Sequence, residues 1–262
     1  MSARRGFGVA AGLEASVAGP LAARCAELGY ESMWSNDHPA ASGLETLARF
    51  ADAAPDLDLG VAVLPLDRHS VAEIAARIKA LGLDRERLWI GVGAGFTRRP
   101  RTLMDAALVD LRRELPGVRL LLAAMGPRMC ELAGSSYDGA FFNWMTPEFA
   151  TTAREWVEAG AREAGRPRPP VFGYVRTALG DDAAGRLAKE EAFYRELHAG
   201  YSNHFQRLGE PEGTVGVAAA SADEIAAKLS AYDRALEVVV VRGLASANVE
   251  AMGELAAAAA PG

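Results

Sequence analysis

The sequence alternates from one end to the other between short apolar runs and longer amphipathic stretches rich in alanine. Such alternation is typical of α/β folds, in which each strand is followed by a helix that packs on a parallel sheet. Continuous apolar runs such as Val238 to Val241 suit strands buried on both faces. Strict alternation of eight strands with helical segments predicts a closed (β/α)8 TIM barrel rather than an open doubly wound sheet, which usually has fewer strands.

The expected elements follow that alternation along the whole chain. We expect strands at 7–10, 30–35, 57–64, 88–93, 118–125, 139–145, 171–177 and 236–242. We expect helices at 16–28, 44–53, 71–81, 103–115, 128–135, 148–164 and 247–258, with further helices between 181 and 232. The prediction is one barrel domain over 1–262 with a helical insertion between the seventh and eighth strands. That insertion would be either a plain amphipathic cover or a substrate lid.

Capping signals support these helix starts. Ser70 with Glu73, and Ser221 with Glu224, have the spacing of capping boxes. Thr146 stands directly before a proline, which suits an N-cap hydroxyl followed by proline at the first helical position. Each signal falls just after an expected strand or loop.

Composition argues against several classes of partner. The net charge is −6 and no long basic stretch is present, so a nucleic-acid partner is not expected. No apolar run approaches the roughly 18 residues of a membrane helix, and we expect neither a membrane segment nor a leader peptide. Cys25 and Cys130 are interpreted as reduced thiols, so we expect a cytoplasmic protein, and we expect it to be a homodimer.

Asp37 and His38 follow the second expected strand, at the barrel face where catalytic residues gather. Histidine exchanges protons near neutral pH, and an adjacent carboxylate can perturb it. The alternative is a turn stabilised by the Asn36 and Asp37 side chains before Pro39. No metal site is expected, because His69 is the one further histidine expected nearby and no Asp or Glu spacing completes a ligand set.

Glycine-rich turns follow the fourth and fifth expected strands. Gly91-Val92-Gly93-Ala94-Gly95 is not a dinucleotide-binding G-x-G-x-x-G loop, and its small residues would leave room for a flat ring or simply form a tight turn. In Met125-Gly126-Pro127, Gly126 would let the backbone approach a ligand while the free N–H groups of the following helix bind an anion. An ordinary strand-to-helix turn is the alternative.

The ordered set of segments resembles the luciferase-like oxidoreductases, especially their F420-dependent branch. The resembling segments lie within residues 29–150 and are GYESMWSNDHP, LDLGVAVLPLDRHSVAEIAARI, LWIGVGAGF, AAMGPRMCELAG and DGAFFNWMTPE. The resemblance implies a barrel whose mouth holds coenzyme F420, with FMN as the alternative cofactor. It implies hydride transfer between the ring and a small-molecule substrate, with the protein positioning the ring.

The resemblance also implies roles for single residues. Asp37 and His38 would lie beside the ring, with His38 as the proton donor or acceptor. Ala62 and Val63, joined by a cis peptide bond, would form a bulge behind the ring, and Gly93 would lie at the barrel mouth.

The cofactor phosphate would bind at the Met125-Gly126-Pro127 turn. The segment after the fourth strand departs from the family pattern, because Gly93 is followed by Ala94-Gly95-Phe96 without the acidic residue of some F420-dependent dehydrogenases. Sugar-phosphate oxidation through such an acid is therefore not expected. The alternatives left open are an FMN-dependent luciferase-like monooxygenase and a barrel that binds a ligand without catalysis.

Overall fold

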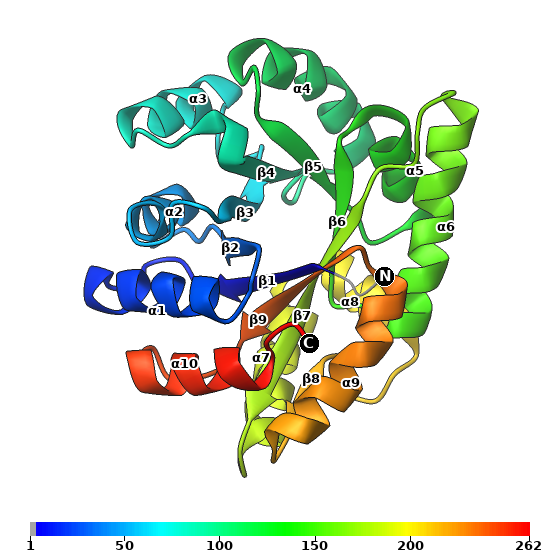
Figure 1. Ribbon diagram of the computed structural model, residues 1–262. Helices are drawn as coiled ribbons and strands as arrows, with labels where there is room; N and C mark the ends of the chain where they lie inside the picture. Colours follow the sequence, from blue (N-terminus) through cyan, green and yellow to red (C-terminus); the bar gives the residue numbers. More distant parts are fainter. Residues whose placement is uncertain (1–3) are drawn as a thin grey trace.

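Eight of the apolar runs pair side by side as parallel strands and close into a ring in the computed structural model, which describes residues 4–262 (Figure 1). The ring order is β6-β5-β4-β3-β2-β1-β9-β7, and pairing of β6 with β7 closes it. The ring strands are β1 (Arg4–Val9), β2 (Ser32–Ser35), β3 (Asp58–Pro65), β4 (Leu88–Gly93), β5 (Arg119–Ala123), β6 (Gly139–Asn143), β7 (Val171–Leu179) and β9 (Val238–Gly243). The expected (β/α)8 barrel is confirmed.

Helices surround the ring in Figure 1 and bury the outer faces of the strands. They are α1 (Ala15–Glu27), α2 (Gly43–Ala51), α3 (Val71–Ala80), α4 (Pro100–Glu114), α5 (Pro127–Ser136), α6 (Pro147–Glu163) and α10 (Val249–Ala258), with a short 3-10 turn at Arg85–Arg87. Side chains alternate along each strand, so Phe7 and Val9 join the outer core beneath these helices. Trp34, Phe141 and Phe172 instead fill the inside of the ring.

The predicted caps are present with one difference. The Ser70 hydroxyl accepts from Glu73 N–H and the Glu73 carboxylate accepts from Ser70 N–H, which is a complete capping box. At the later pair, Ser221 Oγ accepts from Glu224 N–H, but the Glu224 carboxylate accepts from the amide of Ala220. The second bond of this capping box therefore goes to the amide of Ala220, one residue before the N-cap, and not to the amide of Ser221.

The insertion between β7 and β9 holds more structure than the sequence pattern indicated. It contains α7 (Ala183–Leu197), α8 (Ala199–Leu208), the strand β8 (Val217–Ala219) and α9 (Ala222–Ala235). The three-residue β8 pairs with the far end of β7, outside the ring. A Val-Ala-Ala run is too short to show strand periodicity, so this strand was not predicted. In Figure 1, α8 lies behind the ring strands.

A buried ion pair holds the insertion together. The fully buried Glu191 carboxylate on α7 accepts from Arg195 Nη2 at 2.6 Å and from the amide of Val215 at 3.1 Å. The Arg195 guanidinium also lies 4.3 Å from the ring centre of Phe205 on α8. Through Arg195 this carboxylate connects α7 to α8, and through Val215 it connects α7 to the segment that leads into β8.

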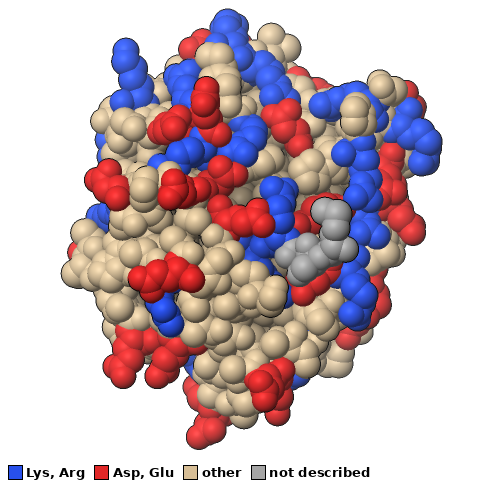
Figure 2. All heavy atoms as spheres, in the orientation of Figure 1, with Lys and Arg blue, Asp and Glu red and all other residues tan. Residues whose placement is uncertain are grey.

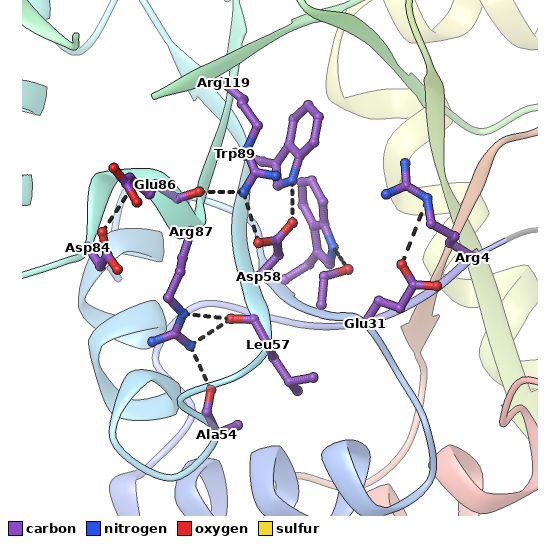
Figure 3. Close-up of polar contacts among 12 residues, drawn as sticks. Arg4, Glu31, Ala54, Leu57, Asp58, Asp84, Glu86, Arg87, Trp89 and Arg119 are labelled. Atoms are coloured by element: carbon purple, nitrogen blue, oxygen red, sulfur yellow. Dashed lines mark hydrogen bonds and ion pairs between the residues drawn. The ribbon is translucent and has the colours of Figure 1, made fainter. Parts of the chain in front are cut away.

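The N-terminal end of the barrel is closed by a polar network (Figure 3). Asp58 accepts from Trp89 Nε1 and from Arg119 Nη2, each at 2.9 Å, and the Arg119 guanidinium stacks 4.2 Å above the Trp89 ring. Beside it, Arg87 donates to the carbonyls of Ala54 and Leu57. Residues at this end of a (β/α)8 barrel ordinarily serve stability rather than catalysis.

Both cysteines are buried and unpaired, as expected. Burial raises the pKa of the Cys130 thiol to about 12, so the thiolate is not formed at neutral pH. On the face shown in Figure 2, Lys and Arg side chains are interspersed with Asp and Glu. Within residues 4–262, no helix combines the length and the apolar character that crossing a membrane would require.

Candidate functional site

The C-terminal ends of the ring strands form an uneven mouth. Strand alternation turns the positions of Gly8, Ala62, Gly93 and Ala123 toward the barrel axis, where they form a layer of small residues next to the aromatic side chains that fill the ring. A Cβ added at Gly8 would stand 2.8 Å from the Tyr174 ring, which shows how closely this layer sits on the one below. On β1, β4 and β5, the last inward position therefore carries glycine or alanine, and on β3 Ala62 is followed at the bulge by Val63.

Three of the predicted cofactor residues lie together at this side of the mouth. A Cβ added at Gly93 would stand 3.5 Å from Ala123 Cβ and 3.5 Å from Val63 Cγ1. The pairing of β3 with β4 shifts register between Ala62 and Leu64, which is the expected bulge. The Ala62–Val63 peptide bond is cis, as the family resemblance implied.

Asp37 is fully engaged by the protein around it. Its Oδ1 accepts from Gly43 N–H at 3.1 Å, at the start of α2. Its Oδ2 contacts Arg68 Nη2 at 3.0 Å and His69 Nε2 at 2.8 Å, both from the loop after β3. The side chain is only 4% exposed. This carboxylate joins three segments at the mouth and is almost entirely shielded from solvent.

His38, in contrast, is exposed at the tip of the loop after β2. Its backbone pairs with Ala41, and its Nδ1 accepts from Ala40 N–H at 3.2 Å. Because Nδ1 is the acceptor, the neutral ring carries its proton on Nε2. His38 therefore presents an N–H donor, and accepting a proton at Nε2 would require the Ala40 contact to open.

Met125, Gly126 and Pro127 lie where α5 begins, after β5, which stands three places from β2 and its Asp37 loop in the ring order. Arg207 from α8 lies over this helix start and donates to the Met125 carbonyl at 3.3 Å. A Cβ added at Gly126 would touch only the Arg207 guanidinium, at 3.7 Å or more, so the free protein has space there for a side chain. A helix N-terminus with an exposed guanidinium above it suits an anion.

Two arginines at the mouth were not singled out in the sequence. Arg176 on β7 and Arg242 on β9 are register partners, and both are buried. Arg176 donates from Nη1 to the Asn143 side-chain oxygen and lies 4.2 Å above the Trp144 ring. The alternation of side chains along a strand could have identified them. Arg176 follows the inward Tyr174 by two residues, and Arg242 follows the inward Val240 by two residues.

Trp144, directly after β6, connects the mouth to the insertion. It has a left-handed backbone with φ of 54°, an uncommon conformation for a bulky residue. Its carbonyl is 2.6 Å from Nε2 of the buried His204 on α8. Burial lowers the pKa of His204 to about 4, so the ring is neutral at physiological pH and donates from Nε2 to this carbonyl.

The loop after β4 is joined to two neighbouring segments. The Asp67 carboxylate accepts from Phe96 N–H at 2.8 Å. Phe96 is 57% exposed and stacks on His198, at the junction of α7 and α8, with ring centres 4.4 Å apart. With the contacts of His204 and Arg207, this stack places the insertion over the C-terminal face of the barrel.

Other parts of the molecule offer weaker sites. A surface hollow of about 440 Å³ lies beside the C-terminal end of α6, toward the N-terminal face of the barrel. Two of its arginines are already engaged, Arg166 with backbone carbonyls and Arg168 with Glu158. Among residues 4–262, no group of three or more His, Cys, Asp or Glu side chains is arranged to hold a metal ion.

Comparison with known proteins adds to this geometry. Residues 96–251 match the family described as luciferase-like monooxygenase. An F420-dependent secondary alcohol dehydrogenase, solved with an F420-acetone adduct, superposes with a TM-score of 0.74 at 15% identity, over 97% of this chain and 97% of that chain. The coenzyme F420-dependent tetrahydromethanopterin reductase of Methanopyrus kandleri gives a TM-score of 0.74 at 17% identity, over 98% of both chains.

A third similar structure carries a flavin. The oxygenating constituent of 3,6-diketocamphane monooxygenase from Pseudomonas putida, solved in complex with FMN, gives a TM-score of 0.69 at 13% identity, over 100% of this chain and 99% of that chain. At such identities these structures show a shared fold alone. The family match spans more than half of the 262 residues, and the chain belongs to the luciferase-like monooxygenase family.

Proposed function

We propose that the protein is an F420-dependent oxidoreductase that transfers a hydride between the deazaflavin ring and a small organic substrate at the barrel mouth. The observation that carries the proposal is the strand-end layer of small residues, in which Gly93 adjoins Ala123 and the bulge of β3 at Ala62 and Val63. A flat tricyclic ring needs such a surface without large side chains, since bulky groups would hold it away from the strand ends.

The described residues fit such a cofactor at two places. Ala62, Val63 and Gly93 would contact the ring, while the start of α5 at Gly126 and the Arg207 guanidinium would hold its phosphate. When bound, F420 supplies a ring carbon that accepts or gives a hydride. The protein contributes position, charge and exclusion of water.

Several groups of the chain would act on the substrate side. His38 would donate a hydrogen bond from Nε2 to a substrate oxygen, because its Nδ1 is held by Ala40 N–H. Asp37 would act as a positioning residue that fixes this loop through Gly43 and His69. The insertion over the mouth would limit the access of water to the reacting atoms.

A second candidate is an FMN-dependent monooxygenase at the same mouth. The likeness to the FMN-containing oxygenating constituent of 3,6-diketocamphane monooxygenase favours it, and the same strand-end layer would accept a flavin ring. A barrel that binds its ligand without catalysis is the third alternative. Homodimer formation and a cytoplasmic location stay predictions, and sedimentation velocity tests the first of them.

The deciding experiment is an equilibrium titration of the purified chain with F420, FMN and NADP, each followed by the absorbance or fluorescence of the cofactor. The proposal expects F420 to bind more tightly than FMN by at least about tenfold, which corresponds to about 1.4 kcal/mol. Tighter binding of FMN would establish the second candidate instead. Binding of neither ring system would refute both.

A further inference from the structure

Two buried guanidinium groups lie side by side at the mouth without a carboxylate partner. Arg176 and Arg242 face each other in the parallel ladder between β7 and β9, and they are 3% and 8% exposed. Within residues 4–262, no Asp or Glu oxygen lies within ion-pair distance of either group. Buried charges in proteins are ordinarily paired at close range, so an adjacent pair of like charges without such a partner favours the binding of an anion from outside the chain.

The neighbours of the two arginines hold their side chains in place but do little to neutralise their charge. Asn143 accepts from Arg176 Nη1 and donates to Tyr201 Oη at 3.3 Å, which fixes the Arg176 side chain. Arg242 donates from Nη1 to the carbonyl of its own neighbour, Gly243, at 2.9 Å. The Arg242 pKa is lowered by burial and by the proximity of Arg176, and the Tyr174 phenol and the more distant Glu190 carboxylate offset this lowering only in part.

Several donors around the pair have no partner. Arg176 Nε, the Tyr174 hydroxyl and Trp144 Nε1 are all buried and make no hydrogen bond. Burial also raises the pKa of the Tyr174 phenol, so the phenol keeps its proton and stays a donor. Unsatisfied buried donors clustered at one place are rare in folded proteins and need an explanation.

We propose that Arg176 and Arg242 form the substrate-anchoring subsite of the barrel mouth and bind an oxyanion group of the substrate, with Tyr174 as a further donor. Guanidinium groups bind carboxylate, sulfonate and phosphate oxygens through charge-assisted hydrogen bonds, and two adjacent groups can share one anion. The substrate is then a small organic molecule that carries a carboxylate, sulfonate or phosphate group, rather than a neutral alcohol or ketone.

The assignment of this anion to the substrate rests on the proposed function, but anion binding itself does not. The small residues Ala62, Gly93 and Ala123 place the ring on the side of β3, β4 and β5. The arginines lie on β7 and β9, where Gly8 of β1 is the register partner of Arg242 and leaves space beside it. The cofactor phosphate has a separate candidate position at the start of α5, beneath Arg207. The two positions can therefore be tested independently with two arginine variants.

The first test measures anion binding to the full chain without cofactor. Acetate, methanesulfonate and inorganic phosphate are titrated by calorimetry at constant ionic strength, with acetamide as the uncharged analogue of acetate. We expect at least one oxyanion to bind, acetamide not to bind, and affinity to fall by about tenfold or more in Arg242→Gln and in Arg176→Gln, since each loses a charged donor. Absence of binding by all three anions, or equal affinity in the variants, overturns the proposal.

The second test separates an anchoring role from a structural one. Removal of an unpaired buried charge should leave the fold as stable or more stable, so Arg242→Met should melt at the same or a higher temperature without ligand. Arg242→Met should also lose the shift in melting temperature that the bound anion produces in the wild type. A clearly lower melting temperature without ligand would mean that Arg242 serves the fold, and the proposal would fail.

The third test compares cofactor affinities. Arg242→Gln should leave the F420 dissociation constant within about threefold of the wild type, whereas Arg207→Gln should raise it by about tenfold or more. If Arg242→Gln weakens F420 binding as strongly as Arg207→Gln, the pair holds the cofactor phosphate and the substrate assignment is wrong. If F420 does not bind at all but the anion results hold, the proposed function fails and the oxyanion subsite stands.

Discussion

Asp37 Oδ2 lies 2.8 Å from His69 Nε2, so a carboxylate at the end of β2 is held by a side chain from the loop after β3. Arg68 Nη2 reaches the same oxygen at 3.0 Å, and Gly43 N–H reaches the other. Asp37 and His38 thus have different roles. Asp37 holds three segments of the mouth together, and His38 is exposed and can contact a bound ligand.

Asp37→Asn should destabilise the protein by about 1–2 kcal/mol, because the amide keeps one acceptor oxygen but loses the charge that Arg68 and His69 contact. Urea unfolding measures the change. Asp56→Asn, at an exposed position before β3, is the matched control and should alter stability little. Equal effects of the two substitutions would show that the Asp37 contacts add no stability.

Gly95 should be indispensable for the loop after β4. Its φ of +62° disfavours any side chain, and an added Cβ would stand 1.8 Å from Asp67 Oδ1. Gly117 has φ of +84° with nothing within 4 Å, so Gly117→Ala isolates the backbone cost, about 1–2 kcal/mol. In thermal unfolding, Gly95→Ala should lower stability clearly more than Gly117→Ala. Adding Asp67→Ala to Gly95→Ala should recover part of the additional loss. Identical costs would contradict the close contact.

His204 should make stability depend on pH between about 4 and 6.5. The folded pKa is lowered to about 4 from the usual 6.5, so in this window the unfolded chain binds a proton that the folded chain does not. Stability is therefore complete above pH 6.5 and falls as the pH drops toward 4, by at most about 1.4 kcal/mol per pH unit. His204→Gln should flatten the dependence of the unfolding free energy on pH within this window. An unchanged slope would refute the assignment.

The network at the N-terminal end of the barrel should matter for stability alone. Asp58→Asn weakens the contacts to Trp89 and Arg119, and we expect a loss of about 1–2 kcal/mol with unchanged cofactor affinity. Glu31→Gln is a control at the same end, because its contact with Arg4 is exposed and 3.8 Å long. Both variants are compared by chemical unfolding and by F420 titration, and a changed F420 affinity in Asp58→Asn would count against the assigned face.

The barrel was predictable because its signal is repeated along the chain. Runs such as Val238 to Val241 are buried on both faces, and Ser70 and Thr146 mark helix starts that the structure reproduces. The strand β8 escaped prediction because three residues carry no period, and its pairing with β7 depends on the insertion around it. Tertiary contacts determine such an element more than local sequence does.

The candidate site was only partly predictable. Turn residues such as Gly93 and Gly126 stand out in a sequence, whereas the partners that decide what Asp37 can do come from a different loop. Arg176 and Arg242 are single charges in apolar strands. Only the alternation of side chains along the strand indicates that they point into the barrel rather than into solvent. The donor state of His38 depends on one backbone amide, which no sequence pattern indicates.

The central claim is that the cofactor ring occupies the side of the mouth bordered by Gly93, Val63 and Ala123. The most direct measurement is the F420 dissociation constant of Gly93→Leu beside that of the wild type and of Asp58→Asn, with circular dichroism confirming the fold of each protein. A leucine there would project from the strand end into the ring position, so affinity should fall by about tenfold or more in Gly93→Leu, while Asp58→Asn binds as the wild type does. Unchanged F420 affinity in a folded Gly93→Leu protein would contradict the claim.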